Sequence, residues 1–433
     1  MANDPYLHPR DVLCQYMARI YGYRMTTTSG GNLSIRDPAS GEIWITPAKI
    51  DKGRLGRSDI VLVKPDGSWE SDAPPSSELP LHQIIYRARP DVRAIVHAHP
   101  VALVAFSIVD QVPSTRVFHQ AWRICGSGAF APYRLPGSAE LGEAIAAALG
   151  AAHSCVILEN HGVVAVGGDL AEAFQRFETF EFAGKSIIKA HLLGGTVREL
   201  SDEDLEVAAE HLPEPDAFTP QAPSTAEQEV RTTLQDFVRR GYRQRLFIST
   251  HGTFSARVDT ESFVITPHDS DRGALERSDL VLVDAGRTAA GSSPSHATRL
   301  HEAIYRRHPH VGAIINAAPV NATAFSITNA VPDTRTIPEC RLVVRSPTLA
   351  HFRLQFEDPD GLAELVSAER PIAILENDGV LVTGESVLEA FDRLEVLEST
   401  AEALINARVL GPLSPMDERA IAELEAIFFP VAD

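Results

Sequence analysis

The sequence predicts an α/β layered fold, built twice in tandem along a chain of 433 residues. The first observation is an internal repeat: residues 81–108 align without gaps with residues 300–327, and 16 of the 28 positions are identical. The second is that helix-like and strand-like patterns alternate within each half. Two further pairs of segments match in the same order, at a nearly constant offset: 43–67 with 263–286, and 156–181 with 373–398. Each half is therefore expected to form one domain.

Each predicted element follows from a local pattern. Short apolar runs bounded by turn residues predict strands, and apolar residues spaced by three and four predict helices. A helix that begins near residue 76 is expected to end at Pro90, because proline cannot continue a helix. In the first half we expect helices at 10–22, 76–90, 137–150 and 169–193, strands at 42–47, 59–67 and 92–100, and a strand, turn and strand at 154–167.

The boundary between the halves is predicted from composition. The segment 211–229, HLPEPDAFTPQAPSTAEQE, is rich in proline, alanine and acidic residues and has no apolar period. We therefore expect a first domain at 1–210, a linker at 211–228 and a second domain at 229–433.

Charge and cysteine content exclude several classes of protein. The formal net charge of −19 disfavours a surface that binds nucleic acid or an anionic membrane, because the phosphate groups would be repelled. The four cysteines form no CxxC pair, which disfavours a disulfide scaffold or a thiolate zinc site. The N-terminal segment lacks the apolar core of a secretory signal, and no apolar run is long enough to span a bilayer. A soluble cytoplasmic protein is expected.

The segment VHAHP indicates a metal site in the first half. Alternate residues of a strand face the same side, so His97 and His99 are expected to project together. His161, in LENHG, offers a third imidazole, and Glu78, at the start of a predicted helix, offers a carboxylate. Such a nitrogen and oxygen set suits one Zn²⁺, with Mn²⁺, Fe²⁺ or Co²⁺ as alternatives. An isolated HxH pair, however, is more often structural or superficial than metal-binding.

The second half acts as an internal control on this interpretation. The four candidate ligands are lost together: Asn316 stands for His97, Ala318 for His99, Asp378 for His161, and Ala297 for Glu78. Their neighbours persist in both halves, for example His82 as His301 and Tyr86 as Tyr305. Loss of a shared ion explains why these four residues changed as a set. The second half is therefore predicted to be a degenerate, non-catalytic copy.

The motifs TSGGNLSIR, ITP, SSE, HAHP, APY and ENHG, in this order, resemble the class II aldolase/adducin family. The resemblance covers residues 10–195 and returns in degraded form over 228–410. It implies an α/β/α sandwich around a mostly antiparallel sheet, usually assembled as a four-fold ring. It implies that His97, His99 and His161 hold a divalent metal and that Glu78 acts at the metal and as the base.

The resemblance also implies further site residues. Tyr133, in APY, would donate a proton from a neighbouring subunit, and its counterpart in the second half is Phe352. A substrate anion would lie on Gly31, Asn32, Ser76 and Ser77. After ITP the family usually has a small polar residue and a glycine, whereas this chain has Ala48 and Lys49. Lys49 could pair with a phosphate or with a carboxylate, so the resemblance does not identify the anion.

Three functions remain open at this stage. The first is a metal-dependent aldolase-type lyase that cleaves a small hydroxy-carbonyl, sugar-like substrate through a metal-stabilised enediolate. The second is an epimerase, dehydratase or decarboxylase of the same family. The third is a non-catalytic, adducin-like scaffold, which the lost ligands fit in the second half only. Since family sites lie between subunits, we expect a homo-oligomer, for which two chains would supply a pseudo-tetramer of four domains.

Overall fold

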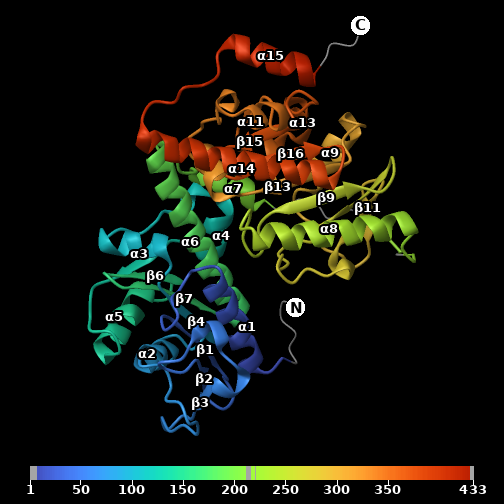
Figure 1. Cartoon of the computed structure of the whole chain (residues 1–433). Coiled ribbons are helices and arrows are strands. Elements are labelled where there is room, and N and C mark those ends of the chain that lie inside the picture. The colour runs from blue at the N-terminus through green and yellow to red at the C-terminus, as the bar shows by residue number, and fades with distance from the viewer. Residues whose placement is uncertain (1–6, 211–215, 220, 430–433) are drawn as a thin grey trace. The chain divides into compact units, whose positions relative to one another are not determined.

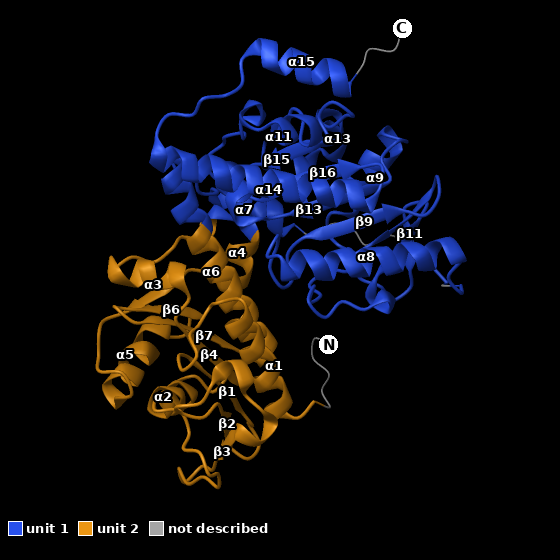
Figure 2. Cartoon of the chain, viewed as in Figure 1, with its two compact units in different colours: residues 1, 117–119, 186–433 blue, residues 2–116, 120–185 orange. Residues whose placement is uncertain are grey.

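The structure is a computed structural model that describes residues 7–210, 216–219 and 221–429 (Figure 1). The described residues form two compact units (Figure 2). Residues 7–116 and 120–185 make the first-copy unit, and residues 117–119 and 186–429 make the second-copy unit. Each unit contains one mixed sheet between helices, so the predicted α/β/α sandwich is present twice.

The first-copy unit contains a seven-stranded sheet in the order β3-β2-β1-β4-β7-β6-β5. Only the β5–β6 pair is parallel, which confirms the mostly antiparallel sheet. The strands are β1 (Asn32–Arg36), β2 (Ile43–Ile45), β3 (Val61–Val63), β4 (Ala94–Ala98), β5 (Ala129–Ala131), β6 (Cys155–Leu158) and β7 (Gly162–Gly167). The longer helices of this half are α1 (Pro9–Gly22), α2 (Leu79–Ala88), α3 (Val101–Ile108), α4 (His119–Cys125), α5 (Ala139–Leu149) and α6 (Leu170–Leu193).

Helices cover both faces of this sheet, because the central strands are apolar on both sides. On one face, α1 and α6 pack through side chains such as Met17 and Phe177. On the other face, α2 and α5 pack through Ile85 and Ile145. Strand β4 lies between β1 and β7, so its side chains are fully enclosed and the end of this strand is a rigid place for a site.

The second-copy unit repeats this plan in a nine-stranded sheet with the order β14-β15-β16-β13-β9-β10-β11-β12-β8. Its strands are β8 (Ala217–Phe218), β9 (Thr253–Arg257), β10 (Ser262–Ile265), β11 (Val281–Asp284), β12 (Arg287–Ala289), β13 (Ala313–Ala317), β14 (Thr348–Ala350), β15 (Ile372–Leu375) and β16 (Gly379–Gly384). Its helices are α7 (Asp202–Ala209), α8 (Thr225–Arg243), α9 (Thr298–Arg307), α10 (Val320–Ser326), α11 (Pro338–Val343), α12 (Leu354–Glu357), α13 (Pro359–Leu365), α14 (Val387–Leu410) and α15 (Glu418–Phe428).

The expected linker is partly structured. Residues 211–215 and 220 lie outside the described residues, but Ala217–Phe218 forms β8, which pairs in parallel with β12. Helix α8 begins at Thr225, inside the expected linker, because Ser224 caps it by accepting a hydrogen bond from the Glu227 backbone N–H at 3.1 Å. Helix α8 thus begins inside the predicted linker 211–228, which stays a prediction. The domain bounds 1–210 and 229–433 also stay predictions. Residues 186–210 pack within the second-copy unit.

The predicted helices and strands of the first half are present, with small shifts at their ends. The helix expected from residue 76 begins at Leu79, because Ser76, Ser77 and Glu78 form the turn that precedes it. No helix of the described residues is long and apolar enough to cross a membrane.

Candidate metal centre

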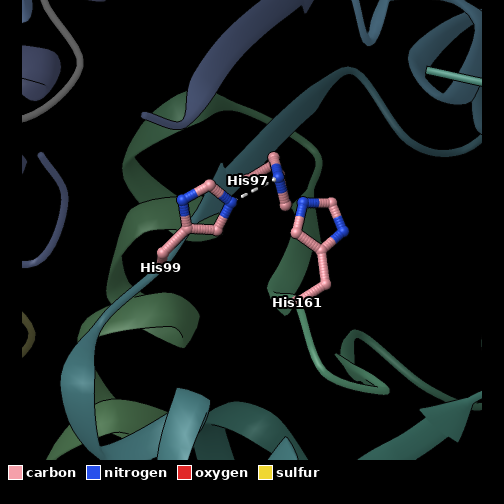
Figure 3. A group of neighbouring side chains, drawn as sticks. All are labelled: His97, His99 and His161. Carbon is pink, nitrogen blue, oxygen red and sulfur yellow. Dashed lines mark hydrogen bonds between the residues drawn. The ribbon is translucent and has the colours of Figure 1, made fainter. Parts of the chain in front are cut away.

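Three histidines converge at the end of β4 (Figure 3). His97 lies in β4, His99 follows it, and His161 lies in the turn between β6 and β7. One ring nitrogen from each histidine can be chosen so that all three lie within 4.8 Å of one another. The Nε2 atoms of His97 and His99 are 3.2 Å apart. Three imidazole nitrogens at this spacing can bind one metal ion.

Glu78 lies beside these rings. Its Oε2 atom is 3.0 Å from His97 Nε2, and its Oε1 atom is 3.4 Å from His161 Nε2. Asn32 Nδ2 donates a hydrogen bond to Glu78 Oε2 at 2.7 Å, and Asn32 is paired directly across from His97 in the β1–β4 ladder. The position immediately before α2 therefore brings the carboxylate to the three imidazoles.

The hydrogen bonds at the site leave nitrogen and oxygen atoms available as ligands for a metal ion. His97 Nδ1 lies 3.0 Å from the Val163 backbone carbonyl, so it donates there and presents Nε2 toward Glu78. Glu78 Oε1 and His161 Nδ1 are buried and have no hydrogen-bond partner among the described residues. Buried polar atoms of this kind are costly unless something binds them. The residues present therefore fit a divalent ion.

Burial and neighbouring charges shift the pKa values of Glu78 and of all three histidines. Burial alone would raise the pKa of Glu78, but His97, Asn32 and His161 together hold it well below its usual range. Burial, followed by the charge of His97, lowers the pKa of His99 to about 3 and that of His161 to about 4. Near neutral pH the carboxylate is therefore ionised and the His99 and His161 rings are neutral. Burial alone would lower the pKa of His97, but Glu78 and the Val163 carbonyl raise it, so His97 must release its proton when an ion binds.

Asn32 is itself held by a residue that the motifs did not identify. His82 is fully buried, and its Nε2 and Nδ1 atoms lie at 2.5 Å from Asn32 Oδ1 and 2.6 Å from Ser34 Oγ. A chain of contacts thus runs from His82 through Asn32 to Glu78. The second half keeps only the contact of this histidine with the serine, as His301 with Ser255 Oγ. His301 also contacts Asn316 Oδ1, which stands in the position of His97.

The described residues of the second copy contain no equivalent group of ligands. The Asn316 Oδ1 atom contacts His301 Nε2. The side chains of Ala318 and Ala297 offer no ligand atom. Within the described ranges, His97, His99 and His161 form the only group of three histidine, cysteine or acidic residues close enough to hold an ion.

A different histidine enters the second-copy centre. His251 stands where the first half has Gly30, and a Cβ atom on Gly30 would lie 3.1 Å from His99 Nδ1. The second copy thus lacks a histidine at the position of His99 and has His251 on the turn that lies next to that position. His251 Nε2 lies 3.9 Å from Asp378 Oδ1, and His119 Nδ1 lies 3.5 Å from the same oxygen. A repeat alignment that pairs Gly30 with His251 could have found this exchange.

The remaining predicted site residues fall into two groups. Gly31 and Ser76 adjoin the centre: a Cβ on Gly31, at φ +69°, would lie 2.8 Å from the His97 carbonyl, and Ser76 Oγ accepts a bond from the Glu78 N–H. Lys49, Ser77 and Tyr133 are exposed. In the part of the chain that the structure describes, none of these three makes a hydrogen bond or ion pair with Glu78 or the histidines.

Comparison with known proteins places the chain in a family. The model described as "Class II Aldolase and Adducin N-terminal domain" matches residues 11–188 and again residues 232–405. The chain belongs to the class II aldolase and adducin family. Each match covers one sheet with its helices, so the family domain occurs twice, as the repeat predicted.

Proteins similar in sequence to this chain include sugar-phosphate aldolases. The L-fuculose phosphate aldolase of Methanococcus maripaludis (strain C7) is 35% identical over 163 residues, which are 37% of this chain and 86% of the relative. That of Escherichia coli (strain K12) is 32% identical over 184 residues, 42% of this chain and 83% of the relative. The 5-deoxy-D-ribulose 1-phosphate aldolase of Bacillus thuringiensis is 29% identical over 190 residues, which are 43% of this chain and 86% of the relative. A solved L-fuculose 1-phosphate aldolase is 31% identical, with a TM-score of 0.43 and 48% and 96% of the two chains covered.

Proposed function

We propose that this chain is a divalent-metal-dependent, class II aldolase-like lyase and that the first copy carries the activity. The observation that supports it most is the convergence of Glu78 with His97, His99 and His161 in one copy only. Relatives named as sugar-phosphate aldolases support a small phosphorylated hydroxy-carbonyl compound as the substrate class. The second copy is proposed to be non-catalytic.

The proposed mechanism assigns each residue a role. His97, His99 and His161 would hold a divalent ion, with Zn²⁺ the first candidate, and the ion would supply Lewis-acid polarisation of a substrate carbonyl oxygen. Glu78 removes or returns a proton beside that carbonyl, and Asn32 fixes its carboxylate by the hydrogen bond at 2.7 Å. Tyr133, from a neighbouring subunit, is proposed to accept the proton of the hydroxyl group that becomes the aldehyde during cleavage and to return it in the condensation direction, which agrees with its 51% exposure within a single chain.

The proposed substrate cradle surrounds the turn before β1. Gly31 and Asn32 border the centre from one side, and Ser76 and Ser77 border it from the turn before α2. Lys49, at φ +52° in the turn after β2, is proposed to meet the anion from the outside. Epimerisation, dehydration or decarboxylation would use the same proton transfer, so the product must be identified directly.

The proposal is tested by assaying cleavage of L-fuculose 1-phosphate with purified, metal-loaded protein and following dihydroxyacetone phosphate. We expect activity that falls at least a hundredfold in His97→Ala and is unchanged in the matched second-copy variant Asn316→Ala. Activity retained by metal-free His97→Ala protein would contradict the mechanism. Failure to cleave this and related ketose phosphates, with an epimer, dehydrated product or carbon dioxide formed instead, would replace the lyase by the second class of reaction.

A further inference from the structure

A buried lysine lies between the two segments of the proposed cradle. Lys52 opens the short 3-10 helix Lys52–Arg54 and is only 2% exposed. Its Nζ atom donates to the Pro47 carbonyl at 2.8 Å, and its backbone N–H donates to the Thr28 carbonyl at 2.8 Å. Thr28 belongs to the turn that leads to Gly31, and Pro47 forms a bridge with Pro75, beside Ser76.

Lys52 has no counter-charge. No carboxylate forms an ion pair with it in the described parts of the chain, and Pro47 is the only acceptor that its side chain contacts. A protonated lysine has three donors, so two of them are unused inside the protein. Burial lowers the pKa of Lys52 to about 8, so the amine is still mostly protonated near neutral pH. A buried cation whose one partner is a neutral carbonyl is costly, which makes it a place where an anion binds favourably.

The second copy shows what a purely structural residue looks like at this position. Its counterpart, Arg272, is also 2% exposed. Arg272 donates from Nε to Gly252 O at 3.0 Å, from Nη1 to Ser270 O at 2.9 Å and from Nη2 to Pro267 O at 3.0 Å. Each of the three guanidinium nitrogens is therefore bonded to a backbone carbonyl. Lys52 keeps the equivalent bond to Pro47 and lacks the other two.

A second unsatisfied group lies on the same turn. The Thr26 hydroxyl is buried and has no hydrogen-bond partner in the described residues. Cβ atoms added to Gly30 and Gly31 would lie 3.1 and 3.0 Å from this oxygen, so the two glycines expose it along the turn. Lys52 is tied to that turn through Thr28. An ammonium and a hydroxyl with free donors thus flank the segment that carries Asn32 to the metal centre.

We propose that Lys52 recognises a negatively charged oxygen group of the substrate, a carboxylate or a phosphate ester, at the Gly30–Gly31 turn. The inference rests on the proposed function and adds a specificity residue to it. The recognising contact is a charge-assisted hydrogen bond from Nζ to an anionic oxygen, with the Thr26 hydroxyl as a second donor. Lys49 is exposed, whereas Lys52 is enclosed, so Lys52 can discriminate between a charged and a neutral substrate more strongly.

The test is calorimetric binding of sodium phosphate and, separately, sodium propionate to metal-loaded protein. The variants are Lys52→Met and Lys52→Arg, and Arg54→Met is the matched control, because Arg54 is an exposed cation on the same short helix. We expect wild type and Arg54→Met to bind one of the two anions equally. Lys52→Met should bind at least tenfold more weakly. Phosphate as the preferred anion indicates an ester, and propionate indicates a carboxylate.

Lys52→Arg separates recognition from a structural role. Arginine should bond backbone carbonyls as Arg272 does, so the protein should unfold at the wild-type temperature and retain its metal, yet bind the anion weakly. Wild-type affinity in Lys52→Arg or in Lys52→Met would overturn the inference, as would absence of binding of both anions to wild type. An inactive wild-type protein that binds the anion through Lys52 would instead contradict the lyase proposal alone.

Discussion

Glu78 is the residue on which the proposed chemistry depends most. It contacts His97, His161 and Asn32, and its carboxylate is ionised near neutral pH because these neighbours lower its pKa. Glutamine keeps the size of the side chain and an oxygen ligand but cannot accept a proton. We expect Glu78→Gln to lower kcat by roughly a hundredfold to ten-thousandfold.

The same variant should lose less metal than His97→Ala, because an amide oxygen can still coordinate. Steady-state kinetics together with metal analysis of both variants measure this difference. Glu70→Gln is the surface control, since the Glu70 side chain is 82% exposed. A Glu78→Gln protein with wild-type kcat would contradict the assignment of Glu78 as the base.

Comparison of the repeats selected the candidate residues more narrowly than the HxH motif alone did. The joint loss of four residues in the second half identified Glu78 and three histidines, and the geometry brings these four together. Burial and hydrogen bonds depend on tertiary packing, which residue spacing does not contain. The contact of His82 with Asn32 and the enclosure of Lys52 were therefore not predictable. Tyr133 and Lys49 stay predictions, because nothing in the described residues tests their roles.

At the scale of elements, a buried glutamate on the long helix of each copy caps the short helix after the central strand. Glu181 on α6 accepts bonds from the Leu103 and Ala102 backbone N–H groups at the start of α3. Glu398 on α14 accepts bonds from the Asn321 and Ala322 backbone N–H groups at the start of α10. Each glutamate also holds the end of the central strand of its copy in place, because α3 directly follows β4 and α10 directly follows β13. Acidic residues on a long helix gave no sequence signal of this role.

Glu398 makes stability depend on pH. Burial raises its pKa to about 7, above the usual value near 4.5. The unfolded chain therefore loses this proton at lower pH than the folded protein, and the stabilisation present below pH 4.5 is lost as the pH rises to 7. The loss is roughly 3 kcal/mol. We expect Glu398→Gln to remove this part of the decline between pH 5 and pH 8.

Urea unfolding at several pH values checks that expectation. The control is Glu229→Gln, because Glu229 is an exposed acid on α8. An identical pH dependence in wild type and Glu398→Gln would show that Glu398 does not titrate in this range. The start of α8 was also not predictable from composition. Its N-cap residue, Ser224, lies in a segment whose proline and alanine content predicted a linker.

At the scale of the whole molecule, equivalent surfaces of the two copies differ in exposure. Within the second-copy unit, Leu193 at the end of α6 is 6% exposed, whereas its counterpart Leu410 at the end of α14 is 90% exposed. Leu410 lines an apolar cavity of about 440 Å³ together with Ile337 and Leu404. In the reverse sense, Ile327 is fully buried, and its counterpart Ile108 is 62% exposed. The end of the long helix is therefore exposed in the second copy only. The end of the short helix after the central strand is exposed in the first copy only.

We propose that two 47.0 kDa chains associate and that the exposed Leu410 and Ile108 surfaces both lie at the interface. Leu410→Glu and Ile108→Glu should each convert a dimer into a monomer. Light scattering after size exclusion measures the mass. Leu388→Glu is the control, because Leu388 is 63% exposed near the start of α14. A monomeric wild type, or dimers that persist in both variants, would contradict this arrangement.

The central claim is that one copy holds a metal ion and the other does not. The most direct measurement is metal content per chain by plasma mass spectrometry, on protein loaded in turn with Zn²⁺, Mn²⁺, Co²⁺ and, without oxygen, Fe²⁺, and then desalted. The account predicts one tightly bound ion per chain in wild type and in Asn316→Ala, and none in His97→Ala or His99→Ala. Two ions per chain, or none under every loading condition, would contradict it.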